Sequence, residues 1–253
     1  MIFTFSHLET QYSFDISKPI DISLPLRNGN NNPSCYYADP VEFETIRAGN
    51  FIGSVAEGGP VNHKKVFVTP HGNGTHTECF GHISADPAGT INKCLTHFFF
   101  IALLVSISPH TVINGDQVIT LTSFQQKAAS FATEAVIIRT LPNDTSKRQR
   151  QYSGANPPYL EPALCDFFAQ HHVKHLIVDV PSVDKEIDGG LLAAHKAFWQ
   201  FPEKIRTDST ITELAFVPDI IADGIYLLNL QICSFELDVS PSKPILYPLQ
   251  KLI

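Results

Sequence analysis

The sequence lacks any long hydrophobic run and any dense cluster of basic residues. Its most apolar stretch, residues 98–107, is about half as long as the ~20 residues that a membrane-spanning helix needs, so we interpret it as a buried strand. Lysine and arginine together number 18 against 25 acidic residues, and the formal net charge is −7. Because nucleic acids are bound through clustered positive charge, we expect neither a nucleic acid nor a membrane as a partner.

The sequence also lacks the patterns of disulfide pairing and of secretion. The cysteines form no Cys-x-x-Cys pair, and their odd number leaves one over in any complete pairing scheme. Free thiols are typical of a reducing compartment. The first residues show no basic segment followed by an apolar core, which is the pattern of a signal peptide. We therefore expect a cytoplasmic protein with free thiols at Cys35, Cys79, Cys94, Cys165 and Cys233.

Composition and hydrophobic patterning predict an α/β fold. The 253 residues are 43% hydrophobic and 17% charged, enough to build a sizeable core in one large domain or two small ones. Apolar, β-branched or aromatic runs predict central strands at 98–107, 135–141, 175–180 and 225–232. Helices are predicted between them at 122–131, 158–172 and 190–199. The turn-rich beginning of the chain indicates an antiparallel or barrel-like part.

The most informative stretch runs from His71 to His82 and reads His-Gly-Asn-Gly-Thr-His-Thr-Glu-Cys-Phe-Gly-His. His76 and Glu78 are two residues apart, so on an extended strand their side chains point to the same face. Imidazole nitrogen and carboxylate oxygen are both ligands of zinc and similar metals. His82 follows four residues after Glu78, near enough to carry protons for a water molecule at a metal. The alternative is a turn rich in glycine and histidine that caps a strand.

Two later stretches hold further candidate ligands. One runs from Asp179 to Asp184 after a predicted strand and continues through two glycines to His195, and the other contains Glu213. Taken singly, each has a structural explanation: aspartates at strand ends often cap turns and helices, and a lone helical histidine is usually a satisfied core residue. The case for a functional role comes from their combination with the first stretch.

In this combination the chain resembles the cyclase family of metal-dependent hydrolases, which includes bacterial kynurenine formamidase and isatin hydrolase. The family signature His-x-Gly-Thr-His-x-Asp-x-Pro-x-His is similar to residues 72–82. The early Asp-Leu-Ser segment of the family corresponds to residues 21–23, and its later Asp-x-Pro-Ser-x-Asp stretch to residues 179–184. The histidine and glutamate that follow in the family correspond to His195 and Glu213. The resemblance covers roughly residues 20–245.

The resemblance implies a mixed swivelling β/β/α-type fold in a single domain, residues 1–253, with a barrel-like central sheet, and a homo-oligomer. It implies a divalent metal ion, for which nitrogen and oxygen ligands leave zinc and manganese open while Cys79 favours zinc. His76 and Glu78 would be ligands, His195 and Glu213 would complete the site, and His82 would be the acid/base. The implied function is hydrolysis of a small amide, lactam or ester, as in an arylformamidase.

The chain departs from the family signature at three positions. Gly72 occupies the position of the first histidine while His71 stands one residue earlier, Glu78 replaces the aspartate, and Phe80 replaces the proline. In a regular strand His71 and His76 would face opposite sides. We predict that Gly72 or Gly74 bends the chain and makes His71 a ligand; otherwise His71 is only a turn residue.

These departures leave a second function open. The chain could be a non-catalytic member of the same fold that binds a metabolite or serves in an assembly, with a degenerate metal site. The missing Gly-x-Ser-x-Gly nucleophile turn argues against a serine hydrolase of the esterase type. Phe80, Phe198 and Trp199 are candidates for an aromatic substrate wall, with core packing as the alternative.

Overall fold

A closed sheet of seven strands forms the centre of the protein. The computed structural model describes residues 1–128 and 131–252. The strands follow the order β16-β9-β12-β14-β15-β8-β17, and β17 pairs back onto β16 and closes the barrel. They are β8 (His76–Cys79), β9 (Phe99–Ile107), β12 (Ala135–Thr140), β14 (His175–Val178), β15 (Thr210–Glu213), β16 (Gly224–Ile232) and β17 (Val239–Pro248). The expected α/β fold with a barrel-like sheet is confirmed.

The parallel strands bring the ends of distant segments to one rim of the barrel. β9, β12, β14 and β15 are parallel neighbours, and every residue of β12, β14 and β15 is buried. Parallel strands covered on both faces are typically continuous apolar runs. β8 runs antiparallel to β15 in a register that sets His76 opposite Glu213. The carboxyl end of β15 and the first residue of β8 therefore lie together at this rim.

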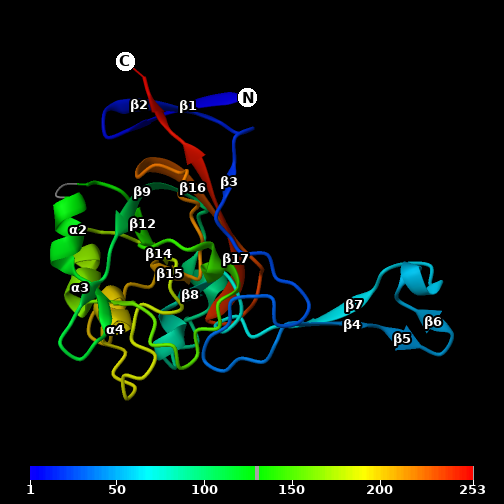
Figure 1. Cartoon of the computed structure of the whole chain (residues 1–253). Helices are drawn as coiled ribbons and strands as arrows, with labels where there is room; N and C mark the ends of the chain where they lie inside the picture. The colour runs from blue at the N-terminus through cyan, green and yellow to red at the C-terminus, as the bar shows by residue number, and fades with distance from the viewer. Residues whose placement is uncertain (129–130, 253) are drawn as a thin grey trace.

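The helices are short, and three of them stack along one side of the barrel (Figure 1). The α-helices are α1 (Ile91–Cys94), α2 (Leu121–Lys127), α3 (Pro162–Gln170) and α4 (Ala193–Trp199). The 3-10 helices are η1 (Val55–Glu57), η2 (Phe80–Ile83) and η3 (Thr145–Gln149). In the described part of the chain, none of the helices combines the length and apolar character needed to cross a membrane.

The structure corrects the boundaries of all three predicted helices. The helix expected at 122–131 ends at Lys127; residues 129–130 lie outside the described residues. The helix expected from Pro158 begins at Pro162, because Tyr159 and Leu160 form strand β13 (Tyr159–Leu160) beside β11. The helix expected from Gly190 begins only at Ala193, because Gly190 and Leu192 have positive φ, which a right-handed helix does not allow.

Further strands are attached to the barrel (Figure 1). The sheet strand β3 (Ile20–Asp21) lies against β17, and a terminal sheet joins β1 (Ile2–His7), β2 (Thr10–Asp15) and β18 (Gln250–Lys251). A small sheet contains β10 (His110–Thr111), β11 (Gln117–Ile119) and β13. A two-stranded arm of β4 (Glu42–Thr45) and β7 (Lys64–Phe67) leaves the body and carries β5 (Arg47–Ala48) and β6 (Phe51–Ile52). The antiparallel part predicted from the turn-rich beginning is thus present.

His175, the first residue of β14, is expected to make the fold less stable in acid. Its side chain is buried, with Nδ1 2.8 Å from the Thr210 hydroxyl oxygen and the ring against Phe100. Burial lowers the pKa of His175 from 6.5 to about 3, because desolvation disfavours the charged ring. Between these values the unfolded chain binds a proton that the folded chain does not. The free energy of unfolding therefore decreases as the pH falls from 6.5 toward 3.

We expect His175 to contribute roughly 3 kcal/mol of this decrease by about pH 4, since one pKa unit corresponds to about 1.4 kcal/mol. Urea unfolding at a series of pH values measures it, with His175→Gln as the comparison because glutamine keeps a polar group beside Thr210 but does not titrate. The variant should show a flatter pH dependence than the native chain. Equal slopes in the two proteins would assign the acid sensitivity to other groups.

Candidate functional site

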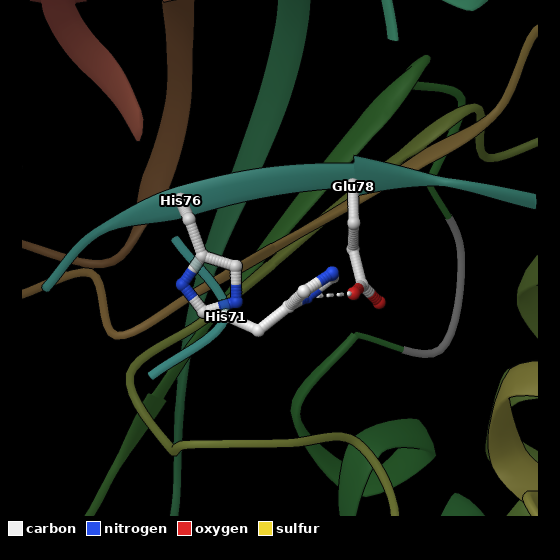
Figure 2. A group of neighbouring side chains, drawn as sticks. All are labelled: His71, His76 and Glu78. Atoms are coloured by element: carbon white, nitrogen blue, oxygen red, sulfur yellow. Dashed lines mark ion pairs between the residues drawn. The ribbon is translucent and has the colours of Figure 1, made fainter. Parts of the chain in front are cut away.

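Strand β8 supplies the centre of the candidate site. His76 and Glu78 are both almost fully buried and project from the same face of this strand, as Figure 2 shows. The shared face predicted from their spacing is therefore confirmed. Cys79 belongs instead to the hydrophobic core, as does Cys94, and it joins none of the possible metal-ligand groups of the described residues. The thiol thus gives no support for zinc over manganese.

His71 reaches the same place from a turn and not from a strand. β7 ends at Phe67 and β8 begins at His76, and Gly74 between them has φ +69°, which is cheap only for glycine. The resulting bend places His71 Nδ1 3.1 Å from Glu78 Oε2 (Figure 2). The predicted bend is confirmed at Gly74, whereas Gly72 has no positive φ. That His71 binds a metal stays a prediction.

His195 and Glu213 complete the cluster from α4 and β15. His195 Nε2 lies 3.0 Å from Glu78 Oε1 and 4.0 Å from Glu213 Oε1. Glu213 Oε2 lies 3.3 Å from His76 Nε2, and its Oε1 accepts a hydrogen bond from the Val183 amide. The convergence expected of His76, Glu78 and Glu213 is therefore present. All of these side chains except the half-buried His71 are buried.

Three histidines each turn one ring nitrogen toward this cluster and anchor the other outside it. His76 Nδ1 lies 3.0 Å from the Gly74 carbonyl, and His195 Nδ1 lies 2.6 Å from Asp184 Oδ2. His71 Nε2 lies 2.9 Å from Asp238 Oδ2. In metal sites a ligating histidine commonly donates its second N–H to a carbonyl or carboxylate, which fixes the tautomer and orients the ring. The outward contacts of all three histidines have this form.

His82 stands at the edge of the cluster on η2. Its side chain is 30% exposed, and Nδ1 lies 3.7 Å from Glu78 Oε2 and 3.5 Å from Asp238 Oδ2. These distances are longer than those between His71 or His195 and Glu78. His82 is therefore near the cluster, open to the cavity and less tightly held, which suits a group that transfers protons.

Sequence reasoning missed Asp238 and explained Asp184 only in part. Asp238 directly precedes β17 and is separated from His71 by 167 positions, and no motif marks it. Asp184 does cap α4, through the amides of Ala194 and His195, and it also accepts from the His195 ring. Asp179 lies elsewhere: it forms a buried ion pair with Lys147 at 2.8 Å and accepts from the Thr140 amide.

The carboxylates and histidines of the site hold one another in their charged forms. Burial raises the pKa of Glu78, but the charge of His82 and a hydrogen bond from His195 outweigh it and hold that pKa well below 4.5. Burial lowers the pKa of His71 and of His195. Hydrogen bonds, to Asp238 and Glu78 for His71 and to Asp184 and Glu78 for His195, nevertheless raise each pKa to about 10. The ionised carboxylates thus keep the His71 and His195 rings protonated and positively charged. A metal cation at the site would displace these protons.

The cluster opens into a cavity of about 310 Å³. Its wall includes Tyr36, Ala38 and Leu192 beside the site, and Lys185, Glu186 and Asp188. Phe80, Phe198 and Trp199 are instead fully buried in the hydrophobic core. The aromatic substrate wall considered for these three residues is therefore not formed by them.

Two observations indicate that the histidines and carboxylates of this cluster fit a metal cation. His76 Nε2 is buried and faces the cluster, and it has no hydrogen-bond partner among the described residues, because its contact with Glu213 Oε2 at 3.3 Å does not have hydrogen-bond geometry. An unsatisfied buried nitrogen is costly and requires an explanation such as an ion. The residues also form three overlapping groups whose ligand atoms lie within 4.8 Å of one another: His71, His76 and Glu78; His71, His82 and Asp238; and Glu78, His82 and His195. Glu213 contacts His76 and His195 but belongs to none of these groups.

Comparison with known proteins places the chain in a family. The family model described as "Putative cyclase" matches residues 15–185, more than half of the chain. The chain belongs to the cyclase family. The resemblance inferred from the sequence motifs is therefore confirmed.

Proteins similar to this chain include enzymes with named activities. The kynurenine formamidase of Bacillus cereus is 28% identical over 235 residues, which cover 92% of this chain and 99% of the relative. Isatin hydrolase A from Labrenzia aggregata aligns with TM-score 0.65 at 11% identity, over 91% of this chain and 93% of the other. A "predicted metal-dependent hydrolase" from Bacillus stearothermophilus aligns with TM-score 0.64 at 15% identity, over 91% and 98%. At these identities the two solved structures show the shared fold alone.

Position 72, where the cyclase-family signature has a histidine, should not tolerate a side chain in this chain. A Cβ on Gly72 would overlap the Cβ of Ala38 and come within 3.2 Å of the Cys35 carbonyl oxygen. Overpacking of this kind typically costs about 1–3 kcal/mol. We therefore expect Gly72→Ala to lower the free energy of unfolding in urea by that amount, and the double variant with Ala38→Gly to recover most of it. A fully stable single variant would show that the turn opens without cost.

Proposed function

We propose that this protein is a metal-dependent hydrolase that cleaves the C–N bond of a small amide or lactam, or a related ester, as an arylformamidase does. The observation that carries the proposal is the inward-facing ring nitrogens of His71, His76 and His195 beside two glutamates, with His76 Nε2 unsatisfied. The cavity of about 310 Å³ suits a small molecule. The similarity to kynurenine formamidases over nearly the whole chain supports an amide substrate.

Each residue has a defined task in this proposal. His71, His76, Glu78, His195 and Glu213 would hold the ion, and their nitrogen and oxygen donors suit zinc or manganese. When bound, the ion would polarise the substrate carbonyl and make a water molecule easier to deprotonate. His82 would accept the proton of the attacking water at its exposed ring and return it to the leaving nitrogen. Asp184 would hold the His195 ring in place.

Metal content and turnover test the proposal together. The protein is purified without a histidine tag, its zinc and manganese are measured by mass spectrometry, and three probes are offered: formanilide as an aryl formamide, isatin as a lactam and phenyl acetate as an ester. We expect about one or two equivalents of metal and turnover of at least one probe, both lost on chelation and restored by adding the metal. A chain that binds no divalent ion at any concentration would overturn the proposal.

The second candidate function is a non-catalytic member of the family that binds a metabolite. The replacement of the first signature histidine by Gly72 and of the aspartate by Glu78 favours it, because both changes alter the ligand set. The same experiment separates the two. Stoichiometric metal with turnover supports the hydrolase, whereas binding of the probes without turnover in the metal-loaded protein supports the binding function.

We also propose that the chain forms a homo-oligomer through the arm of β4 and β7. The arm stands away from the body (Figure 1) and exposes apolar side chains at Val55, Val61, Val66 and Phe67. Exposed apolar patches of this kind are typical of protein–protein contacts. Light scattering after size exclusion should give a multimer for the native chain. A variant in which Asn-Gly, a favoured hairpin turn, replaces residues 46–63 and serines replace Val66 and Phe67 should give a monomer.

We propose that the protein works in the cytoplasm. All five cysteines are free thiols, and four of them are buried. Unpaired thiols persist in reducing compartments.

A further inference from the structure

Position 72 cannot provide the nitrogen that the family signature provides there. The side chain of any residue at Gly72 would run into Ala38. The nitrogen that faces Glu78 comes instead from His71, whose side chain is 28% exposed and is attached to a turn. A ligand on a turn, with a partly exposed ring, needs an additional contact to keep its orientation.

Asp238 supplies that contact and is itself held firmly. The backbone amide of Cys79 on β8 donates to the Asp238 carbonyl at 2.9 Å, and the next residue, Val239, pairs with Glu78. The backbone of Asp238 is therefore fixed to the same strand that carries His76 and Glu78. Its Oδ2 lies 2.9 Å from His71 Nε2, which leaves Nδ1 directed at Glu78.

The chain contains a second arrangement of the same kind. Asp184 holds His195 through Nδ1 at 2.6 Å while Nε2 faces Glu78. Asp184 also caps α4, and this structural role alone would explain why an aspartate stands at that position. Among the described residues, the hydrogen bonds and ion pairs of the Asp238 side chain go only to His71 and His82. Asp238 has no comparable structural task.

We propose that Asp238 is a positioning residue that orients His71 as a metal ligand. In this orientation His71 replaces the histidine missing at position 72. The inference rests on the proposed function, because it requires an ion at the site. Asp238 acts through His71, so its effect on metal affinity depends on the presence of the His71 ring.

A double-mutant cycle with cobalt(II) as the probe tests this dependence. Dissociation constants and visible absorption spectra are measured for the native chain, His71→Ala, Asp238→Ala and the double variant, with thermal unfolding as the check on folding. We expect Asp238→Ala to weaken cobalt binding by about 10- to 100-fold, the usual effect of removing such a partner. In the His71→Ala background the same change should have no further effect on affinity or spectrum.

Two further variants sharpen the test. Asp238→Asn should weaken binding less than Asp238→Ala, because the amide oxygen still accepts the His71 N–H. Glu236→Ala is the matched control, an acidic residue two positions away whose carboxylate bonds Asn92 outside the site, and it should leave cobalt binding unchanged. Equal weakening by Asp238→Ala with and without His71 would overturn the inference and leave the proposed function intact. Loss of a separate cobalt equivalent would also overturn it and make Asp238 a ligand. A native chain that binds no cobalt would overturn both.

Discussion

Replacing His82 with asparagine should leave the metal in place and lower the rate of hydrolysis by about 10²–10⁴, the usual contribution of a general acid/base. His82 faces the cavity with its ring partly exposed, and its Nδ1 lies farther from Glu78 than the corresponding nitrogens of His71 and His195. Asparagine keeps a polar group of similar reach but cannot exchange a proton near neutral pH. The loss should therefore appear in kcat with metal content unchanged.

The measurement combines metal analysis with steady-state kinetics on whichever of the three probes is turned over. His110→Ala is a suitable control, because His110 is exposed on β10. That variant should retain full activity. If His82→Asn loses the ion together with its activity, His82 is a ligand, as its membership of two of the three-residue groups allows.

His71→Ala and His76→Ala should each weaken binding of the same ion by similar factors, which we expect to exceed the roughly 10- to 100-fold loss caused by removing an outer-shell partner. The reason is that His71 Nδ1 and His76 Nε2 face the same group with Glu78. Removing either one takes away a nitrogen donor. Competition with a chromophoric chelator measures both affinities, and His110→Ala again is the unaffected comparison.

The pair of variants also decides what His71 is. If His76→Ala loses the ion while His71→Ala binds it as tightly as the native chain does, His71 is a turn residue and the site has one nitrogen donor fewer. Such a result would favour the non-catalytic function. Thermal unfolding of both variants separates a lost ligand from a lost fold, which matters most for His76 because that side chain is completely buried.

Local sequence was sufficient for the strands of the barrel that are mainly apolar. β9, β12, β14 and β16 were all predicted within a few residues, because parallel and central strands that are mostly buried are typically rich in apolar residues. β17 was not predicted, since it contains Pro241, Pro244 and Pro248, and proline ordinarily argues against a central strand. Closure of the barrel through β17 and β16 depends on pairings between distant segments, which no local pattern encodes.

The parts of the site that local geometry or the family motifs determine could be predicted, whereas a contact set only by long-range strand pairing could not. The common face of His76 and Glu78 follows from strand geometry alone, and the approach of His195 and Glu213 followed from the order of the family motifs. The bend at Gly74 was expected from glycine chemistry. Asp238 could not be found, because its place beside His71 is set by the register of β17 against β8 and leaves no trace near either residue.

β8 is hydrogen-bonded to β15 on one edge and to β17 on the other. A strand held on both edges cannot slip by one residue without breaking two ladders, and such a slip would turn His76 and Glu78 away from the site. The donor atoms of His76 and Glu78 are consequently preorganised before any ion arrives. In small metal-folded domains, by contrast, the ion assembles its own ligands and its removal unfolds the chain. We therefore expect folding and metal loading to be separable, so that removal of a bound ion would leave the barrel folded.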